Sequence, residues 1–191
     1  MESFVDELAY LASRDPLEYR LALLADKPRH QALLRRVAAM SHWGEAPLPG
    51  RARGVAIVEC FGTRIAEVAE VSVEANSVIR VHRVDAAVDC GLVVNPGQAL
   101  AQIQGGVIFG LSAALHQEIT VRGGAVEQRS FPDYEMVRLE SAPRVHVEFV
   151  ESDAPMGGLG EPGVPPIAPA VANAVFALTG KRLRSLPLRL A

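Results

Sequence analysis

The sequence has 191 residues, of which 49% are hydrophobic and 21% are charged, and its formal net charge is −3 at pH 7. This length is enough for a domain of fair size with its own hydrophobic core. The acidic balance and the aromatic content of 5% argue against nucleic acid as a partner, because such proteins need a basic face and often aromatic stacking residues. Cys60 and Cys90 are too few for a disulfide framework and lack metal-ligand spacing, so we expect buried, reduced thiols.

No apolar run approaches the roughly 20 residues that cross a bilayer, and the first residues are acidic, unlike those of a signal peptide. The sequence therefore predicts a chain without a transmembrane segment. We expect a cytoplasmic location, or a periplasmic one if a partner chain carries an export signal.

Three helices are expected at the start of the chain. The first is amphipathic over 3–12, the second begins at Pro16 after the N-cap Asp15, and the third covers 30–42. A turn-rich segment at 45–53 follows them. We therefore predict a helical lobe at residues 1–45 and a second domain at residues 46–191.

The second domain mixes strand and helix patterns. Its first two strands form a hairpin around the turn residues Gly62 and Thr63. The fold class is thus α+β, with a small N-terminal helical lobe followed by a mixed or antiparallel sheet and two longer helices. The strands are expected at 54–61, 64–73, 78–84, 84–91 and 144–151, the longer helices at 98–116 and 169–180, and a small hairpin at 117–129.

The segment 153–166 is rich in glycine and proline and holds one carboxylate, Glu161, at its centre. Glycines allow close approaches while prolines fix φ, so this loop has a defined shape and its carboxylate is a candidate for chemistry. A solvated surface turn is the alternative interpretation. The spacing of Gly158, Gly160 and Gly163 also fits a dinucleotide-binding turn, but prolines and the lack of an adjoining strand argue against it.

Two further features of the chain bear on a site. Asp85 and Asp89 fall in an apolar strand, and buried carboxylates need partners. Gln102 precedes Gly105 and Gly106 in the apolar helix that follows. Gln98 and Gln104 lie in the first turns of the same helix. Either this helix packs closely through its glycines, or the amide of one of these glutamines contacts a polar cofactor.

Three motifs, in this order along the chain, resemble those of one family. They are Val88-Asp-Cys-Gly-Leu-Val-Val-Asn-Pro96, Gln102-Ile-Gln-Gly-Gly106 and Gly158-Leu-Gly-Glu-Pro-Gly-Val-Pro-Pro166. Together they resemble the C-terminal part of the large, molybdenum-binding subunit of the xanthine dehydrogenase/aldehyde oxidase family. Within that family, the chain most resembles the branch of the isoquinoline 1-oxidoreductase β subunit. The resemblance extends over nearly the whole chain.

The resemblance implies a function and a site. Glu161 would be the general base, accepting a proton as water-derived oxygen attacks an N-heterocycle or an aldehyde. Gln102, Gly105, Gly106 and Gly160 would contact the molybdopterin cofactor, in its cytosine dinucleotide form. The remainder of the large subunit and a small [2Fe-2S] subunit would be partners, and no residue of this chain is expected to bind the metal.

The chain departs from the family in length, because the family's large subunit is several times longer and its other molybdenum-pocket motifs are absent here. On its own the chain is therefore expected to be inactive. A non-catalytic remnant or assembly domain that retains the fold is the alternative function. In either case uncovered apolar surface predicts self-association or poor solubility.

Overall fold

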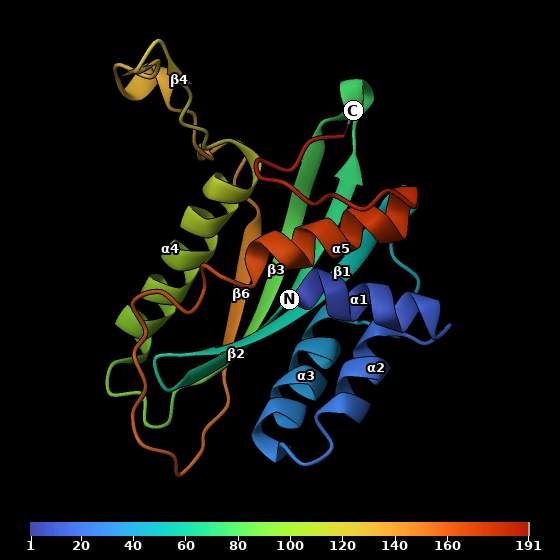
Figure 1. The fold of residues 1–191 in the computed structure, drawn as a ribbon. Coiled ribbons are helices and arrows are strands. Elements are labelled where there is room, and N and C mark those ends of the chain that lie inside the picture. The colour runs from blue at the N-terminus through green and yellow to red at the C-terminus, as the bar shows by residue number, and fades with distance from the viewer. Residues whose placement is uncertain (191) are drawn as a thin grey trace.

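A four-stranded mixed sheet lies between two helical layers in the structure, a computed structural model that describes residues 1–190 (Figure 1). Strands β1 to β3 are antiparallel neighbours, and β6 pairs in parallel with β3. The predicted α+β class with a mixed sheet is confirmed. In the order in which they lie in the sheet, the strands are β1 (Arg51–Cys60), β2 (Thr63–Val73), β3 (Ile79–Asp89) and β6 (Arg144–Phe149).

The helices cover the sheet on both sides. Helices α2 (Pro16–Leu23) and α3 (Pro28–Ser41) pack on one face, and α4 (Pro96–Leu115) and α5 (Ile167–Thr179) pack on the other. Helix α1 (Glu2–Leu11) contacts α2, α5 and β1. The three predicted N-terminal helices are confirmed. Because they share a hydrophobic core with the sheet, the division at residue 45 stays a prediction about independent units.

Two details of the strands differ from expectation. The hairpin turn is made by Phe61 and Gly62, with φ of +53° and +78°, rather than by Gly62 and Thr63, because Thr63 pairs with Cys60. Residues 79–89 form one strand rather than two. The β2–β3 ladder has a bulge at Glu70/Val71, where β3 has one extra residue, His82. The side chains of β3 that face the core under α4 and α5 are therefore odd-numbered up to Val81 and even-numbered from Val84, and the strand continues through the bulge.

Helix α4 is long and apolar enough, by length and composition alone, to cross a bilayer. This corrects the expectation that no such run exists. Its apolarity has a local cause, since Ile103, Val107 and Leu111 are buried in the core shared with the sheet and α5. A core helix meets the same criterion as a membrane span.

The segment between α4 and β6 projects away from the body of the fold (Figure 1). It carries a short hairpin, β4 (Val121–Arg122) and β5 (Ala125–Val126), and a 3₁₀ turn at Phe131–Asp133. Another 3₁₀ turn, at Ala75–Ser77, precedes β3. We call residues 117–142 the arm. The arm exposes several large apolar side chains, namely Ile119, Val121, Val126, Phe131, Met136 and Leu139. Such exposure is expected of a surface that another chain covers. Self-association itself stays a prediction.

The two aspartates of β3 are buried and have partners, as predicted. Asp89 accepts hydrogen bonds from Arg29 Nε at 2.6 Å, Ser152 Oγ at 2.6 Å and the Gly91 N–H at 3.2 Å. Burial alone would raise the pKa of Asp89, but these hydrogen bonds lower it to about 2. The Asp89 carboxylate therefore joins α3, the end of β3 and the segment after β6.

A third acidic side chain, Glu67 in β2, is fully buried and has no hydrogen-bond partner among residues 1–190. In register it lies between Ala56 and Ala86, both of which belong to the core under α4 and α5. Burial raises the pKa of Glu67 well above its usual range. The native fold thus favours the neutral carboxyl group.

We predict that Glu67→Gln raises the melting temperature at pH 8. Because the folded-state pKa of Glu67 is raised, the stability it contributes is present below its unfolded pKa and is lost as pH rises through the folded pKa. The variant should therefore exceed the native chain by more than about 2 °C at pH 8 and by less near pH 4.5, as measured by thermal unfolding followed by circular dichroism. Glu127→Gln, on the arm, is the control and should show no pH-dependent difference; equal behaviour of the two variants would contradict the argument.

Candidate functional site

A depression of about 560 Å³ lies between α4, the β1–β2 turn and the loop before α5. We call it the candidate site. Every residue that the sequence singled out for catalysis or cofactor contact lines it, although they come from separate segments. The lining residues are Phe61, Gln102, Gly105, Gly106, Phe109, Gly160, Glu161, Val164 and Pro165.

Contact between backbones holds the loop against α4. A Cβ added to Gly163 would lie 2.9 Å from Ile103 O, and one added to Gly110 would lie 2.7 Å from Val164 O. Gly106 faces Gly163 at a distance that leaves ordinary contact, 3.5 Å from an added Cβ to Gly163 Cα. The closely packed helix considered for this segment is therefore present at these glycines.

Two other glycines of the site face open space. A Cβ added to Gly105 or to Gly160 would meet nothing within 4 Å among the described residues. Gly105 and Gly106 therefore differ: Gly106 packs against the loop, and Gly105 leaves the helix surface accessible. A flat or bulky group could approach the α4 backbone at Gly105.

Gln102 joins the helix to the loop. Its Nε2 donates a hydrogen bond to Gly160 O at 2.9 Å, across 58 positions of sequence. Within residues 1–190 no hydrogen bond is recorded to Gln102 Oε1, so the amide has an acceptor available for a ligand. Gln104 is used elsewhere, donating to Val145 O at 3.1 Å.

Glu161 is exposed in this chain, next to the buried residues Pro162 and Gly163. Its main-chain carbonyl accepts a hydrogen bond from the Val164 N–H at 2.9 Å, which closes a turn. Burial raises the pKa of the neighbouring Cys60 thiol, and the charge of Glu161 raises it further. Cys60 is only half-buried, contrary to expectation, and both cysteines are free.

The two aromatic residues of the site were not predicted from the sequence. Phe61 and Phe109 are 64% and 63% exposed and both line the depression. Phe61 has a positive φ in the hairpin turn, which is unusual for a residue with a Cβ. Phe109 could have been found by spacing, because positions 102, 105 and 109 lie on one face of a helix.

The structure does not support a dinucleotide-binding turn at Gly158. Strand β6 ends at Phe149 and α5 begins at Ile167, so neither element adjoins the glycines. Among residues 1–190, no group of three or more His, Cys, Asp or Glu side chains could hold a metal ion. The chemistry of the site thus comes from one carboxylate, one amide, two aromatic rings and exposed backbone.

Comparison with known proteins identifies the relatives of this chain. A family model described as molybdopterin cofactor-binding domain matches residues 34–143, which include every lining residue of the site up to Phe109 but not Glu161. The beta subunit of isoquinoline 1-oxidoreductase from Brevundimonas diminuta is 40% identical over 98% of this chain and 25% of its own length. A nicotinate dehydrogenase subunit from Pseudomonas putida is 32% identical over 98% of this chain and 17% of its own length.

A solved structure also resembles the fold. Quinoline 2-oxidoreductase from Pseudomonas putida 86 aligns with a TM-score of 0.60 at 24% identity, over 65% of this chain and 17% of that chain. The chain therefore spans about a quarter or less of the length of these relatives.

We predict opposite effects on stability for two glycines of α4. Gly110→Ala should destabilise the fold by about 1–3 kcal/mol, because the new methyl group would overlap Val164 O and Ile167 Cγ2, each 2.7 Å away. Gly105→Ala should stabilise it by about 0.5–1 kcal/mol, because alanine favours the helix and meets no neighbour. Urea unfolding of both variants measures the two free energies. Equal destabilisation would show that the described packing of the loop on α4 is wrong.

Proposed function

Because this chain belongs to the molybdopterin cofactor-binding domain family, we propose that it supplies one wall of the active site of a molybdenum hydroxylase, including its general base. The observation that carries the proposal is the meeting of Gln102, Gly105, Gly160 and Glu161 at one depression, although they come from separate segments. A carboxylate beside an accessible amide and accessible backbone is a site for a polar, flat cofactor.

The residues present fit such a cofactor. Gly105 and Gly160 leave space where a side chain would intrude, and Gln102 offers Oε1 as an acceptor while its Nε2 fixes the loop. Gly106 maintains the packing that positions these groups. When bound, the molybdenum cofactor would supply the redox chemistry, while the protein supplies binding and orientation.

Glu161 would act as the general base. Glu161 lines the depression, and the buried Pro162 and Gly163 hold the loop on α4, so the main chain at Glu161 has a defined position relative to Gln102. A base positioned in this way can accept the proton of a water-derived nucleophile as it attacks the substrate carbon. Phe61 and Phe109 would limit water and contact the apolar part of the substrate.

The substrate and partners belong to the same proposal. Isoquinoline 1-oxidoreductase and nicotinate dehydrogenase are named for N-heterocycles, which supports that substrate class. An aldehyde oxidoreductase subunit of Escherichia coli, 32% identical over 61% of this chain, supports an aldehyde as the other class. Since the chain spans a quarter or less of these relatives, the rest of a large subunit would complete the site. A small [2Fe-2S] subunit would accept the electrons, and the cofactor would be the cytosine dinucleotide form.

A second function, a non-catalytic remnant or assembly domain, is favoured by one observation. Glu161 is exposed, and the depression is open when formed by this chain alone. Such a domain would keep the fold and its exposed arm without binding the cofactor.

We predict that Glu161→Gln lowers kcat by about a hundredfold to ten-thousandfold, because the amide cannot accept the proton. Turnover is measured with an N-heterocycle in the complex assembled from this chain and its co-purified partners. Assembly and molybdenum content should be unchanged. Glu151→Gln, an exposed carboxylate that does not line the candidate site, is the control and should keep native kcat. Full activity in Glu161→Gln would end the assignment of the base.

We expect near-stoichiometric molybdenum per chain when the tagged protein is purified from its native host, because the site presents an unfilled acceptor and open glycines to the cofactor. Elemental analysis measures the metal, and mass spectrometry identifies large-subunit and iron–sulfur partners. Metal-free protein without such partners would instead support the remnant function.

A further inference from the structure

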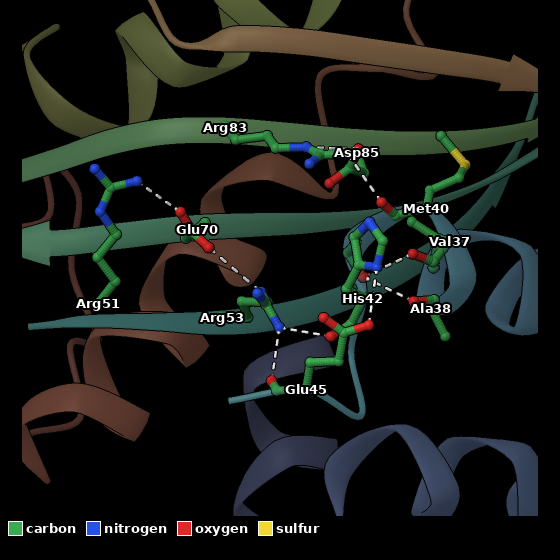
Figure 2. Close-up of polar contacts among 11 residues, drawn as sticks. Val37, Ala38, Met40, His42, Glu45, Arg51, Arg53, Glu70, Arg83 and Asp85 are labelled. Carbon is green, nitrogen blue, oxygen red and sulfur yellow. Dashed lines mark hydrogen bonds and ion pairs between the residues drawn. The ribbon is translucent and has the colours of Figure 1, made fainter. Parts of the chain in front are cut away.

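A second depression, of about 500 Å³, lies on the other face of the sheet from α4 and α5, beside the C-terminal end of α3 (Figure 2). We call it the arginine depression. Side chains from all four strands of the sheet line it, because the β2–β3 bulge turns both His82 and Arg83 toward this face. It shares no lining residue with the candidate site.

The strand register brings its charges together. Arg53, Glu70, Arg83 and Arg144 are direct partners across β1, β2, β3 and β6. With Arg51 and Asp85, the lining residues comprise four arginines and two carboxylates, which leaves two positive charges uncompensated.

Most of these arginines have structural partners. Arg51 Nη1 donates to Glu70 Oε1 at 2.8 Å, and Arg83 Nη2 donates to Asp85 Oδ1 at 2.6 Å. Arg53 Nη1 and Arg83 Nη2 also donate to the carbonyl oxygens of His42 and Met40, at 2.7 and 2.8 Å, and so cap the C-terminal end of α3 (Figure 2).

Arg144 is different, because its side chain is exposed and has no hydrogen bond or ion pair to residues 1–190. It is the register partner of Arg83 on the parallel strand β6, so a second guanidinium group lies beside one that Asp85 already neutralises. Capping of α3 does not explain Arg144. An anion between these guanidinium groups would remove the repulsion.

His82 also lines the depression. His82 Nε2 lies 2.8 Å from Ser72 Oγ. Burial is the main cause that lowers the pKa of His82; the charges of Arg51 and Arg80 lower it further, and those of Glu70 and Glu74 oppose them. This shift favours the neutral imidazole, which can both donate and accept a hydrogen bond.

We propose that the arginine depression binds a dianionic oxyanion of the phosphomonoester class, with Arg144 as its principal ligand. The planar guanidinium group forms paired hydrogen bonds with such oxygens, and the two uncompensated charges match a dianion rather than a monocarboxylate. The site is independent of the molybdenum cofactor and of Glu161.

Calorimetric titration of the full chain with inorganic phosphate, at pH 7.5 and low ionic strength, tests the proposal. We expect saturable binding of one phosphate per chain, with acetate at least about tenfold weaker. Arg144→Gln should weaken phosphate binding about tenfold to a hundredfold, the loss expected for charge-assisted hydrogen bonds. Arg144→Lys keeps the charge but not the planar group, so its affinity for phosphate should lie between those of the native chain and Arg144→Gln.

Arg122→Gln, on the arm, is the matched control, because it removes the same charge at a distant, exposed position. It should bind phosphate as the native chain does. The proposal is overturned if phosphate shows no saturable binding, if acetate binds equally well, or if Arg144→Gln and Arg122→Gln have the same affinity. Thermal unfolding without phosphate should find Arg144→Gln at least as stable as the native chain, because it removes the contact with Arg83.

Discussion

The contact between the backbone of α4 and the loop before α5 is the constraint on which the candidate site depends. Where Gly106, Gly110 and Gly163 meet, no side chain separates the two segments, and the loop turns back with Glu161 facing α4. The same contact brings Gly160 within hydrogen-bond reach of Gln102. Along both segments, residues that pack stand next to residues that line the depression, so a change in either set would move the other.

The two faces of the sheet carry different chemistry. The face under α4 and α5 is apolar apart from Glu67, and the candidate site at its edge holds one carboxylate. The face under α3 instead carries four arginines, beyond the C-terminal end of that helix. Bulging of the β2–β3 ladder separates these surfaces, because it changes which residues of β3 face each side.

Local patterns were enough to predict much of the fold. Helical periodicity and the N-cap Asp15 located the first helices. The glycine-rich loop and Gln102 were singled out separately along the chain, and the structure brings them to one depression, while their roles stay predictions. Phe61 was missed because its role depends on a hairpin turn one residue away from the expected one. The arginine row could not be predicted either, because it exists only once the register of four strands is known. The burial of Glu67 without a hydrogen-bond partner depends on tertiary packing, which local sequence patterns do not predict.

The hydrogen bonds of Asp89 and Gln102 join residues that are far apart in the sequence, and this has a consequence for folding. Asp89 joins Arg29 and Ser152 across 60 and 63 positions, and Gln102 joins Gly160 across 58. Such distant pairs form only after the intervening chain has been ordered, and contacts of this separation slow folding. We therefore expect the candidate site to acquire its shape late in folding, after the sheet. A newly made chain has to complete its sheet before it can retain any cofactor, which separates the time of synthesis from the time of loading.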